Sequence, residues 1–208
     1  PSAAAMATWR KGWDFKARDY VVHPNARLID RPDQTAPTHE GPFRFAFLGL
    51  PLPLKGWPIF RDLANRYAGD PRYAFWHLGQ QPQAGLPIRF QPVRVSPENP
   101  QAMQQAIEDL AIDAVLIWPL CQETFSFTAY EAIASGAAIL TGPDTGNVAA
   151  LVRASQQGRV LTSEDDLAQM FQAGDILSLS RNQRKPTLKA IQHSNLTLDL
   201  ACNSEGAG

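Results

Sequence analysis

The sequence predicts an α/β fold in which a parallel sheet is covered by helices on both faces. Short apolar runs alternate along the chain with segments of helical periodicity, each roughly 10–15 residues long, as in repeated βα units. The 208 residues are 44% hydrophobic and 19% charged, so there are enough apolar side chains for a buried core. This length accommodates one such unit with an extension at each end.

The first half of the expected sheet begins at an apolar run over 43–49 that ends in Gly49, which is typical of a buried strand. Residues 55–69 have apolar side chains at spacings of three, four and three, which predicts a helix with one apolar face. These side chains are Trp57, Phe60, Ala64 and Tyr67. Strands are expected next over 73–78 and 88–95, the second with alternating polar and apolar residues.

The second half continues the alternation. Strands are expected over 114–118, 138–141 and 158–161, and helices over 101–112, 127–135, 146–155 and 164–173. Gly136 directly follows one of these helices, where a residue in the left-handed conformation often ends a helix. Ser163 precedes the last helix as its cap, and the first turn after it is acidic, which suits the helix dipole.

These elements divide the chain into three segments. Residues 1–40 are expected to be an N-terminal extension and interdomain linker, 41–175 the sheet domain, and 176–208 a C-terminal helical tail. The extension mixes aromatic and basic residues, and the tail has a basic cluster, so we expect an amphipathic packing segment and a solvated helix. For both segments the alternative is contact with an anionic membrane surface or a partner.

Composition excludes several classes of protein. A net charge of −1 argues against a nucleic-acid partner, and the sequence has no apolar run of about 18 residues that would span a membrane. Cys121 and Cys202 are far apart, and the four histidines show no metal-ligand spacing, so we expect neither a disulfide scaffold nor a bound metal. We expect no cofactor and a reducing, cytoplasmic location, with membrane association through a longer parent protein as an alternative.

The candidate site lies at the carboxyl ends of the strands, where open parallel sheets bind ligands. The loops over 49–56, 119–126 and 142–147 should share this edge. They provide Lys55, whose ammonium can neutralise a diphosphate, and Glu123, which can bind sugar hydroxyls. Glu131 can accept hydrogen bonds from both hydroxyls of a ribose.

The helix that follows the 142–147 loop adds a further anion site. Thr145, Gly146 and Asn147 stand at its start, where backbone N–H groups are free to bind phosphate oxygens. Lysine, carboxylates and a helix start on one edge predict a nucleotide-linked ligand.

The segment 123–131 resembles the E-x7-E motif of the C-terminal, donor-binding domain of retaining GT-B glycosyltransferases of the group 1, or family 4, type. Residues 21–25 are similar to the end of the family's interdomain linker, and 158–161 to a later strand. The resemblance covers about 20–175. It implies one Rossmann-like half of a GT-B fold, as a fragment of a longer enzyme of glycan or polysaccharide biosynthesis whose N-terminal, acceptor-binding domain is missing.

The resemblance also implies the roles of the site residues. Glu123 contacts the donor sugar as the catalytic residue, and Glu131 holds the ribose of a nucleotide-diphosphate sugar. Lys55 contacts the diphosphate, and N–H groups near Phe125 and Ser126 approach the phosphates or the sugar. No metal is required, because basic groups and helix dipoles stabilise the leaving diphosphate. The fragment alone is expected to bind a nucleotide sugar weakly and to transfer nothing.

Two departures from the family pattern leave an alternative open. Leu50 stands where an arginine normally follows the first strand's glycine, and apolar residues 148–150 replace the glutamate usual after the glycine loop. These changes favour a degenerate, non-catalytic scaffold or glycan-binding module. An NAD-dependent dehydrogenase would need a GxGxxG turn, which 49–54 does not supply. A nucleophilic Cys121 is also conceivable, although a lone cysteine at a strand end is usually a buried thiol.

Overall fold

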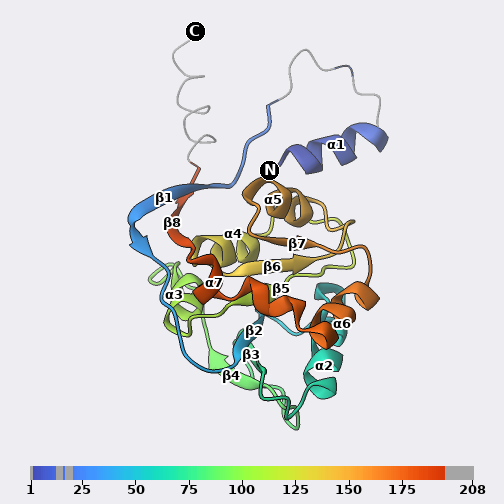
Figure 1. Cartoon of the computed structure of the whole chain (residues 1–208). Coiled ribbons are helices and arrows are strands. Elements are labelled where there is room, and N and C mark those ends of the chain that lie inside the picture. The colour runs from blue at the N-terminus through green and yellow to red at the C-terminus, as the bar shows by residue number, and fades with distance from the viewer. Residues whose placement is uncertain (1, 13–15, 17–20, 195–208) are drawn as a thin grey trace.

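A computed structural model describes residues 2–12, 16 and 21–194. Its centre is a six-stranded parallel sheet in the order β4-β3-β2-β5-β6-β7 (Figure 1). The strands are β2 (Phe43–Leu48), β3 (Tyr73–Gly79), β4 (Arg89–Pro92), β5 (Ala114–Leu116), β6 (Ala138–Thr141) and β7 (Gly158–Val160). The predicted α/β, Rossmann-like class is therefore confirmed.

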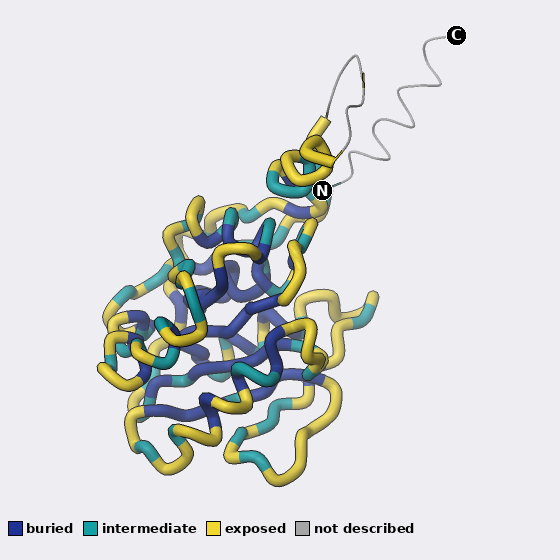
Figure 2. The backbone as a smooth tube through the Cα atoms, turned by 90° about the vertical axis from the view of Figure 1, so that its right-hand side faces the viewer, coloured by how far each residue is buried: buried dark blue, intermediate teal, exposed yellow. Residues whose placement is uncertain are grey.

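Helices cover both faces of this sheet. The helical elements are α1 (Ala3–Gly12), η1 (Pro53–Lys55), α2 (Trp57–Arg66), α3 (Ala102–Asp109), α4 (Phe127–Ala134), α5 (Asn147–Ser155), α6 (Glu164–Ala173), η2 (Asp175–Leu179) and α7 (Arg181–Arg184). One core cluster contains side chains of α2, α6 and η2, and the other contains side chains of α3, α4 and α5. Figure 2 shows the buried sheet between these more exposed layers.

The alternation of side chains along β2 explains why two different cores form. Phe43, Phe45 and Phe47 point to the α2 and α6 face, where they pack in a dense aromatic cluster. Ala46 and Leu48 point to the α3 and α4 face. All five side chains are buried, as expected for a parallel strand with helices on both sides.

The expected helical tail is wrong over its central part. Strand β8 (Thr187–His193) pairs antiparallel with β1 (Ala26–Thr35), a segment expected to be linker and loop. The two strands form a separate ribbon beside α3 and α4 (Figure 1). The basic residue Lys189 forms an ion pair with Asp30 on the partner strand rather than lying on a solvated helix.

The chain just before β8 is fixed to the amino end of β5 by a buried polar cluster. Arg181 is fully buried and its N–H donates to Asp113 Oδ1 at 2.8 Å. Asp113 Oδ2 accepts a second backbone bond from Arg44 at 2.8 Å and contacts His39 Nε2, also at 2.8 Å. Arg184 donates to the carbonyl oxygens of Asp113 and Gly136. These contacts explain why, within the predicted basic tail, Arg181 is buried and Arg184 is half-buried.

None of the helices in the described part of the chain is both long enough and apolar enough to cross a bilayer. Helix α1 lies within the segment expected to be amphipathic, and it contacts α5.

Candidate functional site

Two adjoining cavities lie at the carboxyl ends of the central strands. The larger has a volume of about 500 Å³ and contains Glu131, and the smaller, of about 290 Å³, contains Lys55 and Glu123. Four residues line both cavities, namely Gly49, Leu50, Phe127 and Thr128. The three charged residues predicted from the sequence therefore share one composite site.

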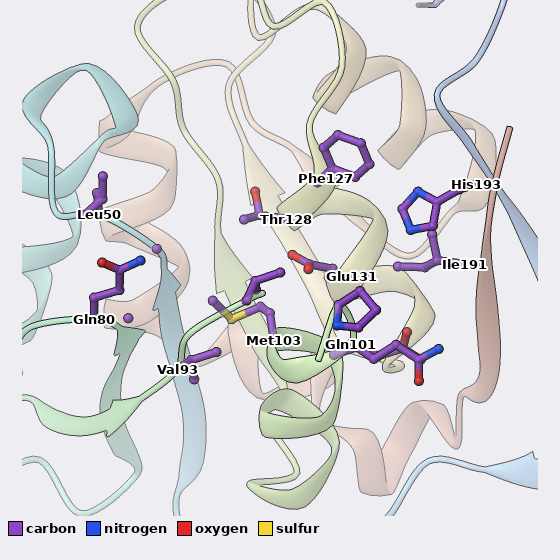
Figure 3. A pocket seen from close by; sticks show the side chains of 15 residues that line it. Leu50, Gln80, Val93, Gln101, Met103, Phe127, Thr128, Glu131, Ile191 and His193 are labelled. Atoms are coloured by element: carbon purple, nitrogen blue, oxygen red, sulfur yellow. The ribbon is translucent and has the colours of Figure 1, made fainter. Parts of the chain in front are cut away.

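Glu131 lies on α4 and points into the larger cavity (Figure 3). The residue is 8% exposed, and burial raises the pKa of its carboxyl group to about 7. Apolar side chains such as Val93 and Met103 form much of the surrounding wall. A carboxylate in such a wall is poorly solvated, so it gains from a ligand that donates hydrogen bonds to it.

Lys55 and Glu123 form an ion pair in the smaller cavity. Lys55 is the last residue of η1, which follows β2, and Glu123 lies in the loop after β5. The ion pair therefore connects the loops that follow two neighbouring strands. The Lys55 side chain is 49% exposed and the Glu123 side chain 16%. Lys55 is thus accessible to an anionic ligand.

The start of α4 separates the two cavities. Phe125 and Ser126, for which the resemblance implies N–H contacts with the ligand, line the smaller cavity. Phe127 and Thr128 begin α4, and the first N–H groups of a helix have no acceptor within it. The partial positive charge at this helix start favours an anion between the cavities.

The Thr145-Gly146-Asn147 segment does not line either cavity. Instead it forms a parallel bridge with the Glu123 loop: Asn147 N–H donates to Glu123 O at 2.8 Å, and Glu123 N–H donates to Thr145 O at 3.3 Å. The expectation of free N–H groups is wrong for Asn147, because its N–H is already used. Gly146 has φ +63°, and a Cβ there would lie 2.6 Å from Glu123 O. The segment therefore holds Glu123 in place.

A buried histidine fixes the loop that follows β2. His77 is 1% exposed, and burial lowers the pKa of its imidazole. As a neutral ring with its proton on Nε2, it donates to Gly49 O at 2.8 Å. Gly49 and Leu50 line both cavities, so His77 acts on the site through their backbone.

Sequence reasoning missed the wall contributed by the ribbon. Ile191 and His193 of β8 line the larger cavity beside Glu131 (Figure 3), and the His193 ring lies 5.9 Å from the Phe127 ring, centroid to centroid. A signal was present in 187–193, where apolar Leu188 and Ala190 alternate with polar residues. The basic residues of the 176–208 tail favoured a solvated helix instead.

Within the described ranges, no three histidine, cysteine, aspartate or glutamate side chains are close enough to hold a metal ion. Cys121 is a free, exposed thiol, which differs from the buried thiol expected at a strand end.

No family model and no curated protein matches this chain. Among solved structures, it is similar to the C-terminal domain of a group 1 glycosyl transferase, LpcC, from Francisella tularensis, with 15% identity and a TM-score of 0.47. It is also similar to HepE of Anabaena in complex with UDP-glucose, at 16% identity and a TM-score of 0.43. A third similar structure is the O-GlcNAc transferase of Thermobaculum terrenum, at 16% identity and a TM-score of 0.46.

The matched regions differ in extent. The likeness to LpcC covers 69% of this chain and 79% of that domain. The chain spans 41% of HepE, with 69% of its own length matched, and 34% of the Thermobaculum enzyme, with 75% matched. The functional proposals below rest on this chain's own residues.

Proposed function

We propose that the two adjoining cavities bind a nucleoside-diphosphate sugar, and that the chain is the donor-binding part of a retaining glycosyltransferase. The observation that carries the proposal is the shared site of Glu131 and the Lys55–Glu123 pair. Two carboxylates and one cation around a helix start match the hydroxyls and phosphates of such a ligand.

The larger cavity suits the nucleoside. Its apolar walls can cover a base, and Glu131 provides a strong acceptor for the two ribose hydroxyls. Binding to the ionised carboxylate would offset the cost of its burial, since each hydroxyl replaces a lost water. Gln80 and Gln101 also line this cavity and offer amide groups from its opposite sides (Figure 3).

The smaller cavity suits the diphosphate and the sugar. Lys55 provides the positive charge, and the start of α4 provides oriented N–H groups. Glu123 can accept hydrogen bonds from sugar hydroxyls. During transfer the bond from the sugar's anomeric carbon to the diphosphate breaks, and a bond to an acceptor oxygen forms. Lys55 and the helix start stabilise the charge on the departing diphosphate, which needs no metal.

The parent enzyme has further parts in this proposal. An N-terminal domain absent from these 208 residues would bind the acceptor, and this chain alone would transfer nothing. By resemblance, we place the enzyme in glycan or polysaccharide synthesis in the cytoplasm, with a membrane contact as an additional hypothesis.

A calorimetric titration with UDP, GDP, ADP and TDP tests the donor site. We expect one of them to bind, and Glu131→Gln to weaken that binding by about tenfold, because a neutral amide is a poorer acceptor than a carboxylate. Glu164→Gln is the matched control, since Glu164 is exposed on α6 and lines neither cavity. Failure of the folded chain to bind any of the four would contradict the proposal.

A second candidate is a non-catalytic glycosyltransferase-like module. It is favoured by Leu50, which lines both cavities and is 56% exposed where an arginine would add a second cation. Substitutions in the parent protein distinguish the two candidate functions. Lys55→Ala and Glu131→Gln should abolish sugar transfer by an enzyme, whereas the binding or scaffolding role of a non-catalytic module would survive both changes.

A further inference from the structure

The loop of residues 122–124, which carries Glu123, is held from two sides. On one side it bridges to Thr145 and Asn147 through the backbone. On the other side it contacts α1, which lies more than 100 residues away in the sequence and packs beside α5 (Figure 1).

The α1 contacts flank Glu123. Ser2 Oγ donates to Thr124 O at 2.7 Å, and Thr8 Oγ1 donates to Gln122 Oε1 at 2.8 Å. Ser2 is buried, and its hydroxyl also accepts a bond from Ala5 N at 3.1 Å. The same hydroxyl therefore provides an acceptor for an N–H group of the helix's first turn and connects that turn to the loop.

Helix α1 packs on the domain through side chains that remain at least partly exposed. None of its ten residues is buried, and an isolated helix of this length is marginal in water. The hydrogen bonds of Ser2 and Thr8 to the 122–124 loop therefore contribute to its docking. The order of α1 and the order of the loop should consequently be coupled.

We propose that α1 is a positioning element for Glu123: by fixing the residues on either side, it keeps the Glu123 carboxylate beside Lys55 in the smaller cavity. The effect of α1 on ligand binding rests on the proposed function, whereas its effect on the loop does not. Ser2 and Thr8 touch no ligand and act through the loop. The contribution should be selective, because Glu131 lies on α4 in the other cavity, whereas Ser2 and Thr8 bond the 122–124 loop.

The first experiment needs no ligand. Hydrogen–deuterium exchange is compared at residues 121–126 for the native chain and for the double variant Ser2→Ala/Thr8→Val. We expect faster exchange in the variant, and native exchange in the conservative pair Ser2→Thr/Thr8→Ser, which keeps both hydroxyls. Lys11→Ala, on the exposed last turn of α1, is the matched control. Unchanged exchange in the double variant would overturn the proposal.

The second experiment measures binding of UDP and UMP, or of the corresponding guanosine, adenosine or thymidine pair if that diphosphate binds instead. We expect the double variant to bind the diphosphate about threefold more tightly, because a Glu123 carboxylate that is no longer held beside Lys55 competes less with the phosphates for that cation. Affinity for the monophosphate should change by less than about twofold.

The outcomes are distinguishable from failure of the proposed function. Equal losses for diphosphate and monophosphate would mean that α1 supports the whole domain, and the positioning role would be wrong. If the native chain binds no nucleotide, the proposed function fails, and the exchange comparison alone decides whether α1 holds the loop.

Discussion

Lys55 Nζ and Glu123 Oε1 form an ion pair that closes the smaller cavity between the loops after β2 and β5. Opposite charges held together in this way largely neutralise each other towards an incoming phosphate. A ligand that engages Lys55 must therefore compete with Glu123, or must offer Glu123 hydroxyl groups in exchange.

Neutralising one member of this pair at a time should distinguish the phosphate-binding role of Lys55 from the sugar-binding role of Glu123. Lys55→Ala is expected to weaken nucleoside-diphosphate binding by about tenfold, because the cation is lost. Glu123→Gln should strengthen binding of the bare diphosphate, since Lys55 is released, and should reduce the preference for the sugar-bearing form. Calorimetric titration of both forms measures this, with Lys55→Arg as the charge-retaining control. A loss of diphosphate affinity in Glu123→Gln would contradict the proposed roles.

Burial of Glu131 predicts a pH-dependent stability. Its pKa is about 7 in the folded chain and near 4.5 without burial, so the folded state binds the proton more tightly. Stability should therefore fall as the pH rises from about 4.5 to 7, by at most about 3 kcal/mol, and should stay level above that range. Urea denaturation of the native chain and Glu131→Gln checks this. The variant should be the more stable at pH 8 and nearly equal at pH 4.5.

The same burial predicts a pH-dependent affinity. If ribose hydroxyls bind the ionised carboxylate, affinity should increase as the pH rises through about 7, and Glu131→Gln should abolish that increase. Titrations between pH 6 and 8 with a nucleotide sugar measure it, because its diphosphate lacks the terminal phosphate group that titrates near pH 6. An affinity that falls over this range, while the ligand's own charge is constant, would assign Glu131 a different role.

A methyl group at Gly146 should disturb the Glu123 loop. The Cβ of Gly146→Ala would lie 2.6 Å from Glu123 O, and the positive φ adds strain, so we expect a loss of about 2–4 kcal/mol in stability. Gly85→Ala is the matched control, because Gly85 has φ +75° but no neighbouring atom within 4 Å. Chemical denaturation compares them. Equal losses would mean that φ strain alone matters and that the close approach relaxes.

The cluster around Asp113 should be critical for the C-terminal segment. Asp113→Ala would remove the acceptor of the buried Arg181 backbone N–H and the negative charge that favours the ionised Arg181 guanidinium, and we expect a loss of about 3–5 kcal/mol. Burial lowers the pKa of Arg181 to about 10, which leaves it charged at neutral pH. Asp62→Ala removes an exposed ion pair and should cost less than about 1 kcal/mol. Urea denaturation midpoints of the Asp113→Ala and Asp62→Ala variants compare these two losses of stability.

The alternating strands and helices were predictable because each depends on local periodicity. The convergence of Lys55, Glu123 and Glu131 followed from topology, since the carboxyl ends of parallel strands share one edge. The β1–β8 ribbon was not predictable in this way. Ala26 pairs with His193, and no local pattern specifies a partner so distant in the sequence.

The residues that form the cavity walls could not be predicted from the sequence for a related reason. Met103 lies in the helix expected over 101–112, and His193 is one of the four histidines without metal-ligand spacing, so the sequence assigned neither residue to the site. Their common cavity exists because the ribbon packs beside α4. Thr145, Gly146 and Asn147 resembled a phosphate site because a helix start normally has free N–H groups, whereas here the Glu123 loop uses one of them.

The antiparallel ribbon also determines how the domain responds to mechanical load. Ala26 and His193 pair with each other at one end of the ribbon. Tension between the chain segments that flank the ribbon therefore breaks the β1–β8 hydrogen bonds one after another, starting at this end. The parallel sheet lies outside this path and is loaded later. His193 and then Ile191 leave the cavity wall first. A pull on the ends of the domain would therefore open the Glu131 cavity before the sheet unfolds.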